Sequence, residues 1–122
     1  MKISLIITTY NWPESLLLVL ESVRCQVTTP SEIIVADDGS DFKTKEVINN
    51  FNNDYGLNII HSWQEDKGFR AAKARNKAIL QASGDYIILI DGDTILHPNF
   101  VKDHCDFAEP GYFVQGSRVL IS

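Results

Sequence analysis

Short apolar runs alternate along the chain with longer stretches in which apolar and polar positions follow helical spacing. The apolar runs predict buried β-strands over Ile3–Thr9, Glu32–Ala36, Leu57–His61 and Tyr86–Ile90. The amphipathic stretches between them predict helices over about Pro13–Cys25, Asp41–Phe51 and Gly68–Ala82. Proline at the expected start of the first helix, with Asn11 or Trp12 near its cap, and Ser83-Gly84 after the third helix support these assignments.

The pattern is weaker after Asp93. Residues Pro98–Phe107 predict a short helix, and Tyr112–Ile121 predicts strand interrupted at Gly116. The sequence ends directly after the apolar residues Val119–Ile121 without a terminal helix. We therefore expect a domain truncated at its C-terminus, cut from a longer protein.

Alternation of strands and helices predicts an α/β fold with a mostly parallel sheet and helices on both faces, as one domain over residues 1–122. Ligands of such sheets bind beyond the carboxyl ends of the strands. Those ends are Thr9-Tyr10-Asn11, Asp37-Asp38-Gly39-Ser40, the loop before Gly68, and Asp91-Gly92-Asp93. The predicted ligand edge is therefore rich in carboxylates.

Composition places the chain among soluble globular proteins, with 44% hydrophobic and 22% charged residues among 122. A net charge of -5 argues against nucleic acid as a partner.

The longest apolar runs, Leu16–Leu20 and Tyr86–Ile90, are far shorter than the roughly 18 to 20 residues that span a bilayer. No signal-peptide pattern precedes the first strand, which favours a cytoplasmic location. Attachment to the inner face of a membrane through sequence beyond Ser122 stays open. We interpret the two cysteines, Cys25 and Cys105, as buried or incidental thiols.

Asp91 and Asp93 flank a glycine at the end of a predicted buried strand. Such a carboxylate pair can hold Mg²⁺ or Mn²⁺, which prefer oxygen ligands, although Asp-Gly is also a common turn without any ligand. A calcium loop of the EF-hand type is excluded, because Leu96 and Lys102 stand where its glycine and glutamate belong.

Two further polar segments carry alternative interpretations. The turn at Asp37-Asp38 can accept hydrogen bonds from a base or from ribose hydroxyls, or it can serve as a helix cap through Ser40 or Asp41. In the third predicted helix, alanines recur on one face. Another face carries the basic residues Arg70, Lys73 and Lys77, which face either a diphosphate or solvent.

Taken in order, four motifs resemble family-2 glycosyltransferases of the GT-A fold over the chain up to about Pro98. They are Thr8-Thr9-Tyr10-Asn11, Asp37-Asp38-Gly39-Ser40, Asp66-Lys67-Gly68 with Ala74-Arg75-Asn76, and Asp91-Gly92-Asp93. The resemblance implies a Rossmann-like three-layer fold and the donor-binding part of an enzyme that uses a UDP-sugar. It implies a base and ribose site made by Thr9, Tyr10, Asn11 and Asp38, with Asp37 as a further candidate.

The resemblance also implies that Asp66 and either Lys73 or Arg75 complete the nucleotide pocket. By the same resemblance, Asp91 would contact ribose or metal, and Asp93 would contact a Mn²⁺ or Mg²⁺ ion. The resemblance further implies transfer to a saccharide or lipid-linked saccharide acceptor with inversion of the anomeric centre and a carboxylate as general base. Asp103, Asp106 and Glu109 come too early to match that base, which is expected beyond Ser122 with most of the acceptor side. Residues 115–118 resemble the start of that side.

Three other interpretations compete with this resemblance. A two-component receiver domain carries its acidic pair after the first strand, whereas here the pair follows the second. A dinucleotide-binding oxidoreductase needs a glycine-rich turn after the first strand, and none is present in the sequence. A non-catalytic nucleotide-sugar-binding or interaction module of the same fold stays open. Four aromatic residues that could stack on a ligand or belong to the core receive no assignment: Trp12, Trp63, Phe69 and Tyr112.

Overall fold

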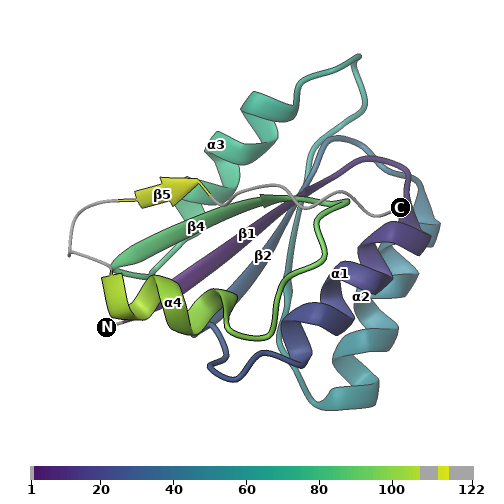
Figure 1. Cartoon of the computed structure of the whole chain (residues 1–122). Coiled ribbons are helices and arrows are strands. Elements are labelled where there is room, and N and C mark those ends of the chain that lie inside the picture. Colours follow the sequence, from purple (N-terminus) through teal and green to yellow (C-terminus); the bar gives the residue numbers. More distant parts are fainter. Residues whose placement is uncertain (1, 108–112, 116–122) are drawn as a thin grey trace.

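A parallel β-sheet runs through the computed structural model, which describes residues 2–107 and 113–115. Its strands lie in the order β3-β2-β1-β4-β5, and each neighbouring pair is parallel (Figure 1). The strands are β1 (Ile3–Thr9), β2 (Glu32–Asp37), β3 (Ile60–Trp63), β4 (Tyr86–Asp91) and β5 (Phe113–Gln115). The first strand therefore lies in the middle of the sheet.

Helices cover both faces of this sheet. They are α1 (Pro13–Arg24), α2 (Phe42–Tyr55), α3 (Ala71–Gln81) and α4 (Phe100–Phe107). Helix α3 lies on one face, and α1, α2 and α4 lie on the other (Figure 1). The predicted α/β fold with a parallel sheet between two helical layers is confirmed.

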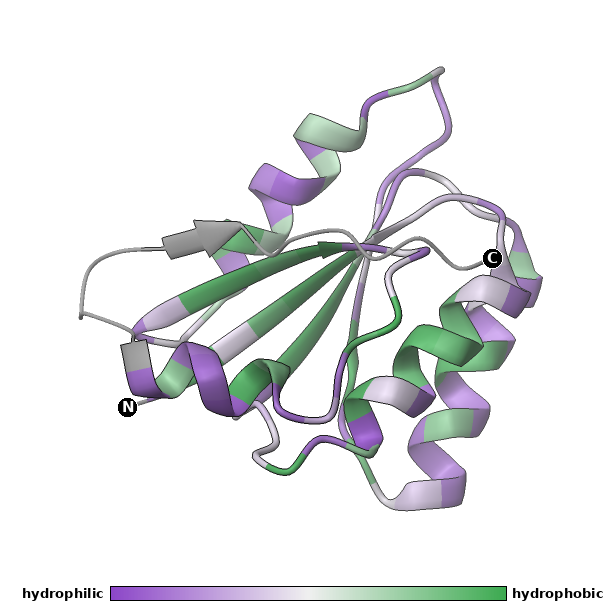
Figure 2. Ribbon diagram, in the orientation of Figure 1, coloured by the Kyte–Doolittle hydropathy of each residue, from purple (hydrophilic) through white to green (hydrophobic). Residues whose placement is uncertain are grey.

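The sheet has an apolar cluster on each face (Figure 2). Because the strands are buried on both faces, their sequences are nearly continuous apolar runs. Leu5 and Ile7 of β1 face α1, where Leu16 and Leu20 are fully buried. Ile6, between them, faces the opposite cluster. Successive side chains of a strand point to opposite faces, so the central strand contributes to both cores.

Helix α3 approaches the sheet through small side chains. Ala74 and Ala78 are buried against Ile6, Ile34 and Ala36. Because an alanine side chain ends at Cβ, the helix axis can lie close to the strands and the first turn can reach the carboxyl edge. The predicted small-residue face thus sets the position of α3.

The predicted third strand, Leu57–His61, is displaced in the structure, where β3 spans Ile60–Trp63. Helix α2 continues to Tyr55 and ends at Gly56, whose φ of 63° is left-handed. The Asn52 side chain then holds the next segment, accepting from the backbone N–H of Ile59 at 2.8 Å and donating to its carbonyl at 3.2 Å. The longer helix and this local cap delay the strand.

The predicted third helix, Gly68–Ala82, is shorter in the structure and begins at Ala71. Gly68 has a φ of 89°, outside the helical region, and the backbone N–H of Arg70 donates to the Asp38 carboxylate. A residue bound in that way cannot belong to the helix interior, so the helix starts after it. At the other end, Ala82 is extended and closes the helix.

Helix α4 covers Phe100–Phe107, within the predicted range Pro98–Phe107. Strand β5, Phe113–Gln115, lies within the range of the last predicted strand. Glu109, Tyr112 and residues 116–122 lie outside the described part of the chain. Both cysteines are free, Cys25 exposed and Cys105 half-buried. Among the described helices, none combines the length and apolar character that a membrane crossing requires.

Candidate functional site

The register of the sheet brings the ends of four strands to one edge. Thr9 pairs with Asp37, Thr8 with Asp91, and Asp37 with Trp63. A pocket of about 270 Å³ opens at this edge, lined by Thr8, Thr9, Tyr10, Trp12, Ala36, Asp38, Phe69, Ala71, Asp91, Gly92 and Asp93. The structure therefore brings residues from three predicted motifs together around one cavity.

Asp38 forms a buried, fixed wall of the pocket, with 4% of its surface exposed. One carboxylate oxygen accepts from Gln64 Nε2 at 2.7 Å, and the other accepts from the backbone N–H of Arg70 at 2.6 Å. A buried carboxylate is costly unless it is hydrogen-bonded, and these contacts meet that need. They also fasten the β3–α3 segment to the end of β2.

Asp37 lies behind the pocket and does not line it. It is fully buried, and its oxygens contact the backbone N–H of Ser40 at 2.9 Å and His61 Nε2 at 2.7 Å. Direct contact of Asp37 with a donor stays a prediction. The neighbouring Asp41 caps α2 by accepting from the backbone N–H of Lys43, which confirms the helix-cap interpretation for that residue.

Tyr10 and Asp66 join the first and third motifs across the pocket rim. The Tyr10 hydroxyl donates to an Asp66 oxygen at 2.8 Å. That hydrogen bond and the negative charge of the carboxylate raise the pKa of Tyr10 above its ordinary value. Gly39, with a φ of 93°, permits the close approach, since a Cβ there would collide with Asp66. The two loops are thus held in contact.

Asn11 connects the first loop to the second. It adopts a φ of 44°, a left-handed conformation that asparagine tolerates better than most residues. Its backbone N–H donates to Ser40 Oγ at 2.7 Å, and its side-chain oxygen accepts from the backbone N–H of Asp41 at 2.7 Å. The predicted site residue Asn11 therefore shapes the pocket through loop contacts.

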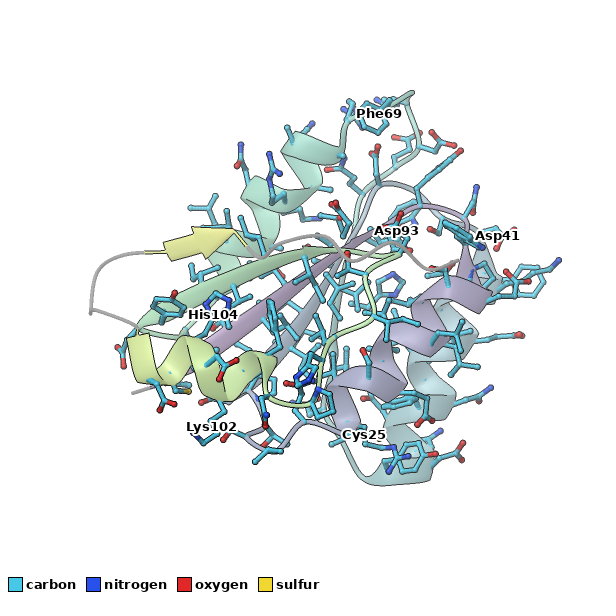
Figure 3. All side chains as sticks on the ribbon, viewed as in Figure 1. Cys25, Asp41, Phe69, Asp93, Lys102 and His104 are labelled. Carbon is cyan, nitrogen blue, oxygen red and sulfur yellow. The ribbon has the colours of Figure 1, made fainter. Side chains whose placement is uncertain are left out.

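The turn after β4 is held against β1. Thr8 Oγ1 donates to an Asp91 oxygen at 3.2 Å, and Ser15 Oγ donates to the Gly92 carbonyl at 2.7 Å. A Cβ on residue 92 would collide with the Thr8 carbonyl oxygen, so only glycine fits this approach. Asp93 belongs to this turn, and Figure 3 shows it at the carboxyl edge of the sheet.

Asp93 Oδ1 is buried, and no hydrogen bond reaches it from the part of the chain that the structure describes. A buried carboxylate oxygen needs a hydrogen-bond donor or a metal ion as its partner. The Asp91 carboxylate lines the same pocket as Asp93. Within residues 2–107 and 113–115, no group of three or more potential metal-ligating side chains converges. Two carboxylates fit Mg²⁺ or Mn²⁺, which share their ligand shell with substrate phosphates and water.

The basic residues of α3 do not line the pocket. Lys73 is exposed, Arg75 is half-buried, and Lys77 Nζ donates to the Trp63 carbonyl at 2.7 Å. Arg70 Nη2 donates to the Glu65 carbonyl at 2.9 Å, which holds the loop before the helix. Contact of Lys73 or Arg75 with a nucleotide stays a prediction.

Sequence reasoning missed Gln64, His61 and Ser15, which hold the motif residues in place. It also left unassigned two aromatic residues that line the pocket, Trp12 and Phe69, exposed by 54% and 92%. Phe69 stands at the far end of the β3–α3 segment (Figure 3). Its place next to Gly68, outside any apolar periodicity, was the available signal that it does not belong to the core.

Known proteins resemble the chain in sequence and in fold. Over 103 residues it is 37% identical to hyaluronan synthase of Pasteurella multocida, an alignment covering 84% of the chain and 10% of that protein. The crystal structure of Staphylococcus aureus TarS 1–349 in complex with UDP-GlcNAc superposes with a TM-score of 0.77 and 30% identity, over 88% of the chain and 31% of that crystallised chain.

A third similarity shows the fold alone. The mannosyltransferase PcManGT from Pyrobaculum calidifontis, in complex with GDP-Man and Mn²⁺, superposes with a TM-score of 0.78 at 21% identity, over 89% of the chain and 33% of that protein. The chain spans about a third or less of each of these relatives. The model of the family described as glycosyl transferase family 2 matches residues 4–122. The chain therefore belongs to glycosyl transferase family 2 and has the GT-A fold.

Proposed function

We propose that residues 1–122 form the nucleotide-sugar-binding part of a glycosyltransferase that takes a UDP-sugar as donor. The observation that carries this proposal is one pocket at the carboxyl edge of the sheet that unites Tyr10, Asp38 and the buried Asp93 oxygen that no described residue hydrogen-bonds. A nucleoside diphosphate needs hydrogen-bond acceptors at its base and ribose and positive charge at its diphosphate. The similar TarS structure was solved with UDP-GlcNAc, which supports a uridine donor.

In this proposal the uracil and ribose lie against the wall formed by Tyr10 and Asp38. Among the described residues, each oxygen of Asp38 accepts one hydrogen bond, and a carboxylate oxygen has a second lone pair that can accept from a base N–H or a ribose hydroxyl. Tyr10 is 49% exposed, so its ring offers an aromatic face to the base. The remaining proposed donor contacts are Thr9, Asn11, Asp37, Asp66, Lys73, Arg75 and Asp91.

The diphosphate lies over the turn after β4, where Asp91 and Asp93 would hold a Mn²⁺ or Mg²⁺ ion. Such an ion, when bound, neutralises the negative charge that develops on the departing UDP. The protein contributes the orientation of the two carboxylates: Thr8 holds Asp91 by a hydrogen bond, and Ser15 fixes the intervening glycine. Because the turn is held by the sheet, the carboxylates need little rearrangement to bind.

Sugar transfer with inversion to a saccharide or lipid-linked saccharide acceptor belongs to the same proposal, as does a cytoplasmic place at the inner face of a membrane. Hyaluronan synthase and TarS, which resemble this chain, are longer proteins than it. No described carboxylate is assigned as the general base. On α4, for example, Asp106 is paired with Lys102 at 3.0 Å.

Calorimetric titration of the chain with UDP, with and without Mn²⁺, tests the proposal. We expect binding that strengthens with Mn²⁺, and an Asp93→Asn variant that loses at least about tenfold in affinity in the presence of the metal, because a charged ligand of the ion is removed. Asp54→Asn, on the exposed side of α2, removes the same charge far from the pocket and should bind as the unmodified chain does.

Two results would oppose the proposal. Absence of UDP binding by a folded chain would remove its basis. Binding that is equally tight with and without Mn²⁺, and unaffected in the Asp93 variant, would favour the non-catalytic module of the same fold and contradict the metal-assisted site.

A further inference from the structure

We propose that His61 is a positioning residue that acts through the buried carboxylate of Asp37 to hold the donor loop, residues 37–41, in its nucleotide-binding shape. The inference rests on the proposed function for its link to the donor. Its structural content, a loop held by a histidine from the neighbouring strand, is tested separately below.

The Asp37 carboxylate is the anchor of this arrangement. It is fully buried, and its two oxygens have different partners. Oδ1 accepts from the backbone N–H of Ser40 at 2.9 Å, within the donor loop itself, and Oδ2 contacts His61 Nε2 at 2.7 Å. A buried carboxylate that lost one of these contacts would retain an unsatisfied oxygen, which is costly. His61 therefore fixes the side chain on which the loop turn depends.

Hydrogen bonds continue from this anchor to the pocket. Ser40, held by Asp37, accepts at Oγ from the backbone N–H of Asn11 at 2.7 Å. Its carbonyl accepts from Trp63 Nε1 at 3.0 Å. Asp38, which lines the pocket, is the next residue after the anchor. Two side chains of β3, His61 and Trp63, thus hold the loop from the side opposite the nucleotide.

The surroundings of His61 make it suitable for substitution. Its side chain is 17% exposed and lies beside a second pocket of about 460 Å³ between α2 and β3. Ser40, Asp41, Phe42, Lys45, Asn49, His61 and Trp63 line that pocket. Because the ring borders open space, a different side chain can replace it without overfilling the apolar core.

The test compares His61→Leu, which removes the hydrogen-bond donor, with His61→Gln, whose terminal amide occupies the place of Nε2 and can still donate to Asp37. Amide hydrogen exchange is measured at Ser40 and Asn11, whose N–H groups belong to the proposed chain of contacts. The amides of Ile6 and Ile34 in the fully buried core serve as the reference for global stability. Asn49→Ala, a change in the lining of the second pocket, is the matched control.

We expect exchange at Ser40 and Asn11 to accelerate by about tenfold or more in the leucine variant, to return close to its original rate in the glutamine variant, and to stay unchanged in the alanine control. Exchange at the core amides should keep its original rate in all of these variants. Equal acceleration at loop and core would show a general structural role, and unchanged loop exchange would overturn the proposal. If the leucine variant fails to fold, His61→Asn, which is too short to reach Asp37, takes its place.

A UDP titration of the same variants separates this inference from the proposed function. If the unmodified chain binds UDP, the leucine variant should bind about tenfold more weakly and the glutamine variant should recover. Tight binding by the leucine variant would contradict a positioning role. If the unmodified chain binds no UDP, the proposed function fails, while the exchange rates still decide whether His61 holds the loop.

Discussion

Gly92 lies where the turn after β4 meets the backbone of β1. A Cβ at this position would collide with the carbonyl oxygen of Thr8, a backbone atom that cannot move aside without shifting the central strand. We predict that Gly92→Ala lowers the free energy of unfolding by about 1 to 3 kcal/mol and abolishes metal-dependent UDP binding, because the strain displaces Asp91 and Asp93. Denaturant unfolding and calorimetry measure the two effects.

Gly84→Ala provides the matched control for that prediction. Its Cβ would collide with Ser4 at the opposite end of the sheet. We expect a comparable loss of stability with UDP affinity retained. Equal loss of binding in both variants would mean that instability alone, and not displacement of the carboxylates, explains the effect at Gly92.

The contact between Tyr10 and Asp66 gives a prediction on pH. The hydrogen bond to Asp66 raises the pKa of Tyr10 above its ordinary value of 10.0. The favourable contribution of a group with a raised pKa is present below the ordinary value and is lost as pH rises through the folded-state pKa. The loop contact should therefore persist at neutral pH and disappear in strongly alkaline solution.

NMR titration of ring-labelled tyrosine measures this pKa directly. Asp66→Asn removes the negative charge and should lower the pKa of Tyr10 toward 10.0. A Tyr10 that titrates alike in the variant and the unmodified chain would show that the two loops do not meet in solution.

Single residues differ in how far the sequence predicted them. Asp38, Asp91 and Asp93 were recognised because motifs at strand ends mark a ligand edge, and all three line the pocket. Gln64 and His61 were missed because their partners lie 26 and 24 residues away along the chain. Such contacts depend on the register between β2 and β3, which no local pattern in the sequence expresses.

At the scale of elements, α3 depends on its small-residue face. Ala78 is fully buried against the sheet, whereas Ala72 lies on the exposed side of the same helix. We predict that Ala78→Leu lowers the free energy of unfolding by about 1 to 3 kcal/mol, because the larger side chain pushes the helix off the strands. Ala72→Leu should change it by less than about 0.5 kcal/mol. Chemical denaturation that ranks the two variants equally would contradict the packing described here.

Helix α4 is attached to the sheet by a titratable contact. His104 Nδ1 lies 3.1 Å from the Tyr86 hydroxyl, and its ring lies 4.7 Å from that of Phe100. Burial lowers the pKa of His104 below its ordinary value of 6.5, and the charge of Asp103 opposes this only in part.

A histidine with a lowered pKa favours the folded state above its ordinary pKa, and that contribution is lost as pH falls through the folded-state value. We therefore predict that the stability of the chain falls between neutral pH and pH about 5 by more than that of a His104→Gln variant. Thermal unfolding at both pH values checks this. A His104 imidazole that titrates by NMR at 6.5 or above would contradict it.

The elements themselves were largely predictable, and their ends were not. Apolar periodicity located every described helix and strand, but α2 and β3 departed from expectation because Gly56 and the Asn52 side chain decide where one ends and the other begins. The start of α3 was misplaced for a related reason, since a tertiary hydrogen bond from Arg70 to Asp38 excludes the preceding residues from the helix.

At the scale of the whole molecule, fold and charge point to one binding edge. The apolar clusters on both faces require helical cover, which leaves the strand ends as the place where polar residues gather. The chain has a net charge of -5, and the pocket contains three aspartates. A polyphosphate bound there needs a cation that offsets this negative charge, which supports the metal dependence that we propose.

Paramagnetic broadening of NMR signals by Mn²⁺ tests this account most directly, because it reports where the ion binds. We predict that Mn²⁺ added with UDP broadens the amide signals of residues 91–93 first, then those of Thr8, Thr9 and Asp38, and leaves those at the opposite end of the sheet sharp. Asp93→Asn should abolish the effect at these positions. Broadening centred elsewhere on the described surface, or none in the presence of UDP, would contradict a metal-assisted nucleotide site at this edge.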